Sequence, residues 1–245
     1  MTGIMETIDY LKKNIKNLLR IFLPWGRRNW VANTYIRGAG IEIGALHNPL
    51  RLPKSAKVKY VDKMSAHKLS KHYPELNSRT FVKVDLIDDG ELLASIQDNT
   101  QDFVIANHFL EHCENPISSI GNMLRILKND GILYISIPDK RYTFDIDRPV
   151  TSMEHLMNDY QKGPDWSRRM HFEEWAKLVD KVQDHVEIEK YADHLMNIDY
   201  SIHFHVWTQT EMLELMLAIK KIFHFEFELF VRNGPEMIII LKKSE

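Results

Sequence analysis

Short apolar runs alternate with amphipathic stretches through the first half of the chain. The runs are rich in β-branched residues, and they lie at 39–43, 58–61, 81–84, 103–106 and 132–137. Short apolar runs of this kind are typical of strands that are buried on both faces of a sheet. Their alternation with amphipathic stretches predicts a parallel sheet that carries helices on its faces.

The clearest helix is expected over residues 116–128. Asn115 is a favourable N-cap, and Pro116 suits the first helical position. Leu127 belongs to the apolar face of this helix, and residues 129–131 (Asn-Asp-Gly) are expected to end it. A shorter helix is expected over residues 88–96, capped by Asp88 or Asp89 and carrying Leu92, Leu93 and Ile96.

The C-terminal part has a different pattern. Thr208 and Glu211 form a capping box that predicts a helix through Ile219. Two strand-like runs follow at 223–231 and 237–241, with Asn233-Gly234 between them as a strong hairpin signal. The mostly parallel sheet is therefore expected to finish with an antiparallel pair.

Residues 139–206 do not follow the strand–helix alternation. Helices are expected near 151–162, 166–182 and 187–196, and no convincing strand is present. We interpret this segment as a helical insertion that follows the fifth strand and covers the mouth of a site. The predicted organisation is an N-terminal helical extension, 1–37, followed by one domain, 38–245.

Residues 4–22 carry apolar side chains at helical spacing, with Lys and Arg among them. The stripe is expected to pack on the domain or on a partner chain. The alternative is peripheral contact with an anionic membrane surface.

Composition narrows the class of protein. The formal net charge of the 245 residues is −2, which gives no reason to expect nucleic-acid binding. Cys113 is the only cysteine, so an internal disulfide and a cysteine-based zinc site are excluded. No apolar run is long enough to cross a bilayer, and the N-terminus lacks the features of a secretory signal. A cytoplasmic location is expected.

The predicted strand ends carry the candidate chemistry, because ligands of open α/β sheets bind at the carboxyl ends of the strands. Gly44 allows close approach of a ligand to the backbone. Asp62 follows the second strand and can accept hydrogen bonds from two ribose hydroxyls. Asp85 follows the third strand and can accept from an adenine amino group. The alternative for each acid is an ordinary helix cap.

These strand-end motifs resemble the class I S-adenosylmethionine-dependent methyltransferases. The similarity is closest to a bacterial small-molecule group that is often encoded beside glycosyltransferases. It covers residues 39–142 and resumes at 205–208, and its most diagnostic part is 107–116. The resemblance implies a Rossmann-like, mostly parallel seven-stranded sheet with an antiparallel last strand, and S-adenosylmethionine as cofactor. The cofactor-binding residues that it implies, together with neighbours at the same strand ends, are Glu42, Gly44, Ala45, Leu46, Asp62, Lys63, Asp85, Leu86, Asn107 and His108.

The first loop departs from the family pattern, which is glycine-rich and leads into a full helix. Here Pro49 and Pro53 leave room for one or two helical turns at most. The methionine carboxylate of the cofactor is therefore expected to be held differently. His47, Asn48 and Arg51 are the candidates, and ordinary loop residues are the alternative.

Methyl transfer requires alignment of the acceptor and, for an oxygen nucleophile, usually a general base. The catalytic candidates are His108, Asp139, His171 and His205. His112 is expected to face the helix that begins at Pro116, in a structural role. His203 and His205 suggest a metal site, but the sequence places no third ligand beside them, so no metal is predicted.

The acceptor is expected to contact Lys140, Arg141 and Tyr142. Arg148, Arg168 and Arg169 are further candidates for binding a phosphate or carboxylate, and solvated helix charge is the alternative.

The leading hypothesis is O-methylation of a sugar, a nucleotide-sugar or a surface-glycan precursor in polysaccharide biosynthesis. The alternatives are N- or carboxyl-methylation of another small metabolite, and a non-catalytic cofactor-binding subunit. A nicotinamide oxidoreductase is disfavoured because Gly-x-Gly-x-x-Gly is absent.

Overall fold

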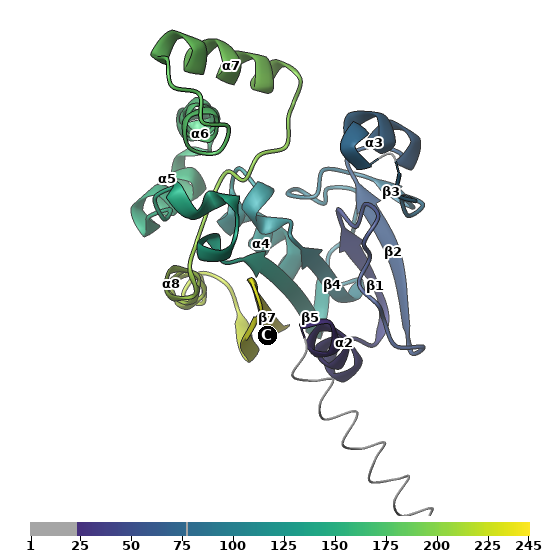
Figure 1. Cartoon of the computed structure of the whole chain (residues 1–245). Helices are drawn as coiled ribbons and strands as arrows, with labels where there is room; N and C mark the ends of the chain where they lie inside the picture. Colours follow the sequence, from purple (N-terminus) through teal and green to yellow (C-terminus); the bar gives the residue numbers. More distant parts are fainter. Residues whose placement is uncertain (1–23, 77) are drawn as a thin grey trace, which may run out of the picture.

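The fold centres on one seven-stranded sheet (Figure 1). The computed structural model describes residues 24–76 and 78–245, so the amphipathic stretch 4–22 lies outside the described residues. The strand order is β3-β2-β1-β4-β5-β7-β6. The strands are β1 (Gly38–Ile43), β2 (Ala56–Asp62), β3 (Leu86–Ile87), β4 (Gln101–Asn107), β5 (Leu127–Pro138), β6 (Phe225–Asn233) and β7 (Glu236–Lys243).

Only β7 runs against its neighbours. The pairs β1·β2, β1·β4, β2·β3 and β4·β5 are parallel, whereas β7 is antiparallel to both β5 and β6. The hairpin predicted at Asn233-Gly234 joins β6 to β7. The predicted fold class, a mostly parallel seven-stranded sheet that ends in an antiparallel pair, is confirmed.

Helices cover both faces of the sheet. On one face lie α4 (Pro116–Ile126) and α8 (Gln209–Ile219), whose buried side chains join the larger apolar cluster with Ile41, Ile43 and Val104. On the other face α2 (Pro24–Tyr35) buries Val31 and Ala32 against a second cluster. The predicted caps are present: the Asn115 side chain accepts from Ser118 N, and the Thr208 capping box is formed.

The structure differs from the prediction at three elements. The third strand lies at 86–87 instead of 81–84, and Asp85 precedes it instead of following it. Residues 88–96 form turns instead of a helix; Asp89 accepts from the backbone N–H groups of Glu91 and Leu92, but Leu93 adopts a φ of 48°. Helix α4 ends at Ile126, two residues early, because the chain passes directly into β5.

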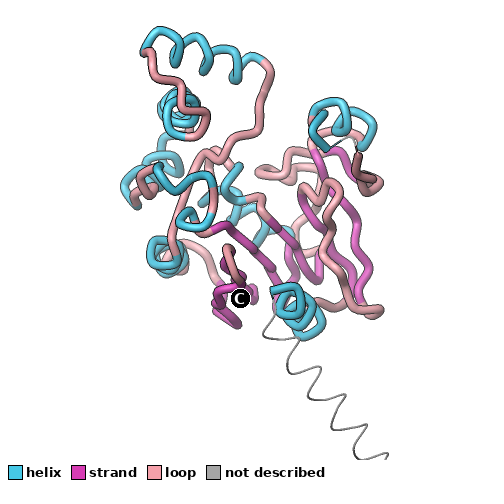
Figure 2. The backbone as a smooth tube through the Cα atoms, viewed as in Figure 1, coloured by secondary structure: helices cyan, strands magenta, loops and turns pink. Residues whose placement is uncertain are grey.

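The predicted helices of the insertion are all present (Figure 2). After the 3₁₀ turns η3 (Lys140–Tyr142) and η4 (Phe144–Asp147) come α5 (Met153–Lys162), α6 (Asp165–Leu178) and α7 (His185–Asn197). Among the described residues, the short helices α3 (Ala66–His72) and η1 (Pro74–Leu76) lie near the β3 side of the sheet, and η2 (Leu110–His112) follows β4.

Residues 201–207, which we call the return segment, connect α7 to α8. An apolar cluster that includes Phe172, Trp175, Leu195 and Phe204 joins α6 and α7 to this segment. None of the helices among the described residues is both long and apolar enough to cross a membrane.

Candidate functional site

The carboxyl ends of β1 and β4 lie side by side in the centre of the sheet. Ile43 is in register with Ala106, which brings Glu42 and Asn107 together. The buried Glu42 carboxylate accepts from the backbone N–H of Leu50 (3.0 and 3.1 Å) and from Asn107 Nδ2 (3.0 Å). Burial raises the pKa of Glu42 to about 7, although these hydrogen bonds act in the opposite direction. The Glu42 side chain is thus fixed in the protein interior at the carboxyl end of β1.

The loop after β1 leaves the sheet through a left-handed residue. Gly44 has a φ of 63°, and its N–H donates to Val61 O at 2.9 Å. A Cβ at Gly44 would meet only Phe109, at 3.7 Å. No helix forms between β1 and β2, as the two prolines predict; Ala45 is buried and Leu46 also adopts a positive φ.

At the end of β2, Asp62 accepts from the backbone N–H of Lys63 at 2.8 Å. Burial raises the pKa of Asp62 to about 6, against the opposing effect of that hydrogen bond. The Lys63 side chain forms an ion pair with Asp199 at 2.7 Å, which links this strand end to the insertion.

Asp85 does not lie at a strand end, contrary to the prediction. Its carboxylate accepts from the backbone N–H of Tyr60 at 3.1 Å. Strand β3 pairs only with Val61 and Asp62 through Leu86 and Ile87, so Tyr60 has no strand partner on that side. Asp85 supplies the missing acceptor, which is a structural task.

A pocket of about 500 Å³ lies beside the edge of the sheet that is formed by the carboxyl ends of the parallel strands. It is lined by Arg28 and Asn29 of α2, by residues 47–51 of the first loop, and by Asn233, Pro235 and Glu236 of the β6–β7 hairpin. His47, Asn48 and Arg51, the candidates from the sequence for holding the methionine carboxylate, are all among its lining residues. Arg28 and Glu236 were missed: Arg28 Nε donates to Glu236 at 2.7 Å, across 208 positions of sequence that no local pattern connects.

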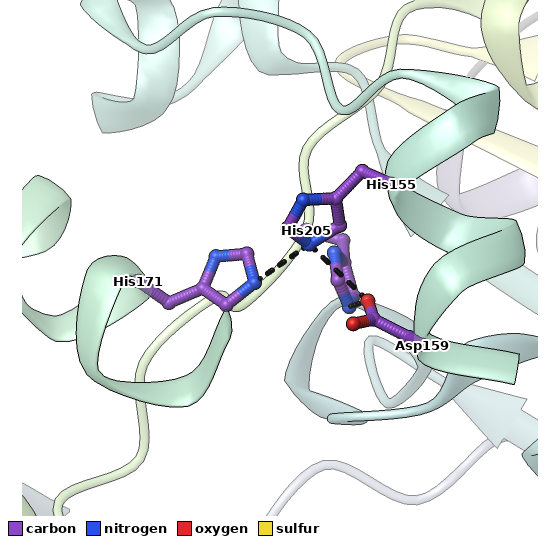
Figure 3. Close-up of side chains that lie close together, drawn as sticks. All are labelled: His155, Asp159, His171 and His205. Atoms are coloured by element: carbon purple, nitrogen blue, oxygen red, sulfur yellow. Dashed lines mark hydrogen bonds and ion pairs between the residues drawn. The ribbon is translucent and has the colours of Figure 1, made fainter. Parts of the chain in front are cut away.

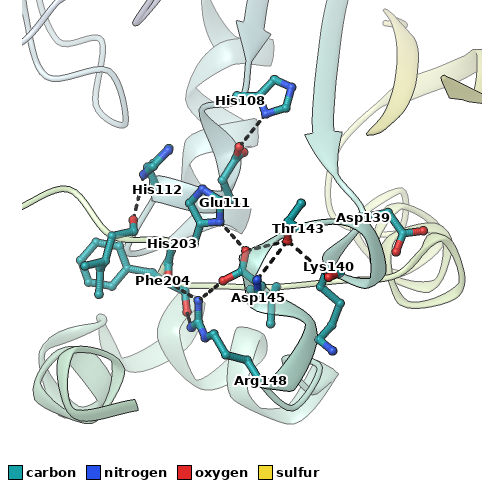
Figure 4. A network of polar contacts seen from close by, with 12 residues as sticks. His108, Glu111, His112, Asp139, Lys140, Thr143, Asp145, Arg148, His203 and Phe204 are labelled. Carbon is teal, nitrogen blue, oxygen red and sulfur yellow. Dashed lines mark hydrogen bonds and ion pairs between the residues drawn. The ribbon is translucent and has the colours of Figure 1, made fainter. Parts of the chain in front are cut away.

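His108, at the end of β4, lies between two carboxylates. Its Nε2 is 2.8 Å from Glu236 and its Nδ1 is 3.3 Å from Glu111. Burial would lower the pKa of His108, but the two carboxylates outweigh burial and raise it to about 9. The ring therefore carries a proton at neutral pH, which does not suit a general base. Figure 4 shows His108 directed at Glu111.

Asp139 is buried and bound to its neighbour. Its carboxylate accepts from Arg141 Nε at 2.9 Å and from Nη2 at 2.6 Å, and it also caps η3. Burial tends to raise the pKa of Asp139, but the bonds from Arg141 prevail and lower it. An ion-paired carboxylate of lowered pKa is a poor proton acceptor, so these contacts do not favour Asp139 as the base.

The predicted acceptor residues lie next to the hairpin that lines the pocket. Asp139 N donates to Pro235 O at 2.9 Å, and the Arg232 guanidinium lies 4.5 Å from the centre of the Tyr142 ring. Tyr142 and Arg141 are exposed, whereas Lys140 Nζ donates to Ile146 O at 2.7 Å.

The other predicted catalytic histidines, His171 and His205, are buried within the insertion. Burial lowers the pKa of His171 to about 3 and that of His205 well below its ordinary value. The structure does not bring them together with His108, and their lack of exposure opposes a role as base. His112 faces the return segment instead of α4, with Nδ1 2.8 Å from Ile202 O.

The three other arginines that were considered for anion binding already have hydrogen-bond or ion-pair partners. Arg148 is buried and donates to Asp145, Glu174, His203 O and Phe204 O over 2.7–3.1 Å (Figure 4). Arg168 pairs with Glu114, and Arg169 pairs with Glu173 and Asp193. The suggestion that these side chains bind an anionic acceptor is therefore not supported by their contacts.

The edge of the sheet retains unused hydrogen-bonding groups. Asn107 Oδ1 and His47 Nδ1 are buried without a hydrogen-bond partner among the described residues. Buried polar atoms normally have a partner. Together with the uncrowded backbone at Gly44 and the carboxylate of Asp62, these atoms fit a polar ligand that carries hydroxyl and amino groups.

Comparison with known proteins agrees with this arrangement. The family model described as "Methyltransferase domain" matches residues 17–218. No curated protein matches the chain.

Three solved structures are among those similar to this chain. One, from Rhodobacter sphaeroides and assigned as a zinc-dependent alcohol dehydrogenase, has a TM-score of 0.51 at 17% identity, over 89% of this chain and 90% of that one. A SAM-dependent methyltransferase from Aquifex aeolicus has a TM-score of 0.45 at 11% identity, over 86% and 85%. For the CurJ carbon methyltransferase the values are 0.44 and 12%, over 86% of this chain but 50% of that chain. At these identities the likeness concerns the fold alone.

Proposed function

This chain belongs to the methyltransferase-domain family, and from that premise we propose that it methylates an oxygen of a sugar, a nucleotide-sugar or a surface-glycan precursor. The prediction of a class I S-adenosylmethionine-dependent methyltransferase is confirmed by the family match and the strand order, and S-adenosylmethionine is the cofactor. The observation that carries the acceptor class is the arginine-bearing pocket beside the strand ends.

The cofactor is expected to lie across the ends of β1, β2 and β4. Asp62 accepts from the ribose hydroxyls, and the backbone of residues 44–46 approaches the ligand where Gly44 leaves space. The unpartnered Asn107 Oδ1 suits a donor such as the methionine amino group. Asn48, in the pocket wall, is the candidate that we keep for the methionine carboxylate, and Arg51 is assigned to the acceptor. The insertion 139–206 is proposed to cover the acceptor side of domain 38–245.

The acceptor is expected to be anionic or strongly polar. Arg28 and Arg51 line the pocket, and Arg141 and Arg232 flank Tyr142 at the adjoining hairpin. Guanidinium groups bind phosphate and carboxylate in a bidentate manner, and an exposed tyrosine can pack on a sugar face.

When bound, S-adenosylmethionine supplies a methyl group that the sulfonium has already activated, so the protein must align the acceptor and remove its proton. His108 is already protonated and is better suited to orient Glu111 and Glu236. The His47 imidazole lies in the pocket wall, and we assign to it the acceptance of the proton.

Incubation of the full chain with labelled S-adenosylmethionine and a panel of acceptors tests this proposal. Transfer to a hydroxyl of a phosphate-bearing sugar supports it. The Arg51→Gln variant should then raise KM for such an acceptor about tenfold, as expected for one lost charge-assisted bond. The matched control is Lys57→Gln, an exposed cation at the opposite end of β2.

Other outcomes favour other functions. Transfer only to a nitrogen or a carboxylate would replace O-methylation by the alternative chemistry. Tight cofactor binding without transfer to any acceptor, together with a stable partner chain, would indicate a non-catalytic subunit.

A further inference from the structure

Four potential metal ligands converge inside the insertion, on the side of the return segment (Figure 3). His155 and Asp159 lie one helical turn apart on α5, His171 comes from α6, and His205 comes from the return segment. One ligand atom from each residue lies within 4.8 Å of all the others. Asp159 and His205 are completely buried, and His171 is nearly so.

The distances within the cluster match a shared ion. His155 Nε2 is 3.0 Å from His171 Nε2 and 3.2 Å from Asp159 Oδ2, and His205 Nε2 is 3.6 Å from Asp159 Oδ2. Tetrahedral zinc has bonds of about 2.0–2.2 Å to nitrogen and oxygen, which places its donor atoms about 3.3 Å apart. The observed spacings scatter around that edge length.

Hydrogen bonding alone does not account for the cluster. His155 Nε2 carries at most one proton, yet it faces both a nitrogen of His171 and an oxygen of Asp159. Asp159 Oδ2 is buried without a hydrogen-bond partner among the described residues. A cation in the centre would use these lone pairs together.

The surroundings hold the cluster in place. Asp159 Oδ1 accepts from the buried Ser167 hydroxyl at 2.8 Å, which fixes the carboxylate so that Oδ2 faces the histidines. Such an outer contact to a carboxylate ligand is a regular feature of protein metal sites. His205 Nε2 lies 3.3 Å from Glu114 O, a contact that the metal would replace.

We propose that His155, Asp159, His171 and His205 bind one divalent transition-metal ion, with zinc the best match, as a structural site that fastens the insertion. Three imidazoles and a carboxylate are a donor set that zinc accepts, and four protein ligands leave no open position for catalysis. The ion would join α5, α6 and the return segment, whose Phe204 N donates to Glu111 O beside the end of β4.

A neighbouring group is a weaker candidate. Glu111, His112 and His203 also come close together, but they offer three donors. His112 Nδ1 already lies 2.8 Å from Ile202 O, and His203 Nδ1 lies 2.7 Å from Asp145. This group therefore serves as the comparison in the experiment.

Elemental analysis of the full chain, purified without a polyhistidine tag, tests the proposal. We expect about one zinc ion per chain, the stoichiometry of a closed structural site. Removal of the metal with a chelator should lower Tm by about 10 °C, and zinc alone should restore it. His171→Gln and Asp159→Asn should lose the metal. His185→Gln should retain it, because His185 is exposed on α7 and pairs with Glu189 at the same i,i+4 spacing.

Cobalt binding by the metal-free wild-type chain decides the question even if a variant does not fold. Cobalt alone should give the intense visible bands of tetrahedral coordination, and zinc should abolish them. The proposal is overturned if the folded wild-type chain takes up neither ion, or if His203→Gln loses the metal while His171→Gln keeps it. Binding of S-adenosylhomocysteine is measured in parallel, so a failure of this site is distinct from a failure of the proposed function.

Discussion

The carboxyl edge of the sheet and the helical insertion use polar residues in opposite ways. At the edge, several polar groups are only partly used: Asp62 accepts from the N–H of the next residue, and Asn107 Oδ1 has no partner among the described residues. In the insertion, Arg148 donates to two side-chain carboxylates and two backbone carbonyls while it is completely buried.

This difference separates residues that await a ligand from residues that hold the protein together. A buried charge whose hydrogen-bonding capacity is filled mainly contributes to structure, whereas spare capacity at a strand end favours binding. The two regions should therefore respond differently to mutation: the insertion in stability, and the edge in affinity for the cofactor.

The largest effect is expected from Arg148→Met. Removal of one partner of a buried ion pair leaves Asp145 without its cation, which costs about 3 kcal/mol or more. For a chain of this size, Tm should fall by roughly 6–12 °C, as measured by thermal unfolding. The affinity for S-adenosylhomocysteine should change little if the insertion is mainly structural.

Arg169→Met is the matched control for that substitution. Arg169 belongs to the same insertion and pairs with Glu173 and Asp193, but Arg169 and Asp193 are exposed to solvent and Glu173 is partly exposed. Exposed pairs contribute about 1 kcal/mol at most. Equal losses of Tm in the two variants would contradict the contrast between buried and exposed charge.

The next effect is expected from Asp62→Ala. Loss of a carboxylate that accepts from ribose hydroxyls should weaken binding of S-adenosylhomocysteine roughly 10- to 100-fold, with little change in Tm. Asp85→Ala is the comparison, because the Asp85 carboxylate already accepts from Tyr60 N. Its loss of affinity should be smaller. A larger loss at Asp85 than at Asp62 would restore the adenine-binding role first inferred from the sequence.

The smallest effect concerns His108, which is half-exposed and lies between the two regions. Its folded pKa of about 9 lies above the ordinary value of 6.5, so the folded state holds the proton more tightly. The resulting stability is complete below about pH 6.5 and is lost as pH rises through about 9. Urea unfolding should show a steeper decline in stability from pH 6.5 to 9.5 for the wild type than for His108→Gln. Parallel declines would contradict the charge pairing with Glu111 and Glu236.

Much of the fold could be predicted from the sequence because its signals are local. The Asn115 cap, the Thr208 capping box and the Asn233-Gly234 hairpin each act within a few residues. The third strand could not be placed, because its two-residue pairing depends on contacts with β2 and not on its own apolar run. The helix expected over residues 88–96 does not form, and Asp88 instead accepts hydrogen bonds from Ser95 across a turn.

The site could be predicted only where the strand ends define it. Glu42, Gly44 and Asp62 follow from strand ends, but Arg28 and Glu236 meet through tertiary packing alone. The histidine cluster shows the same limit. His205 was considered as a metal ligand, but His155, Asp159 and His171 lie 34–50 positions earlier in the chain and meet it only when α5 and α6 pack together.

Calorimetric titration of the full chain with S-adenosylhomocysteine tests the central claim most directly, because binding of this product requires no knowledge of the acceptor. We predict one site per chain with a Kd in the micromolar range, and a clear loss of affinity in Asp62→Ala. Absence of binding to the folded wild-type chain at millimolar ligand would contradict the assignment of this strand end as the cofactor site.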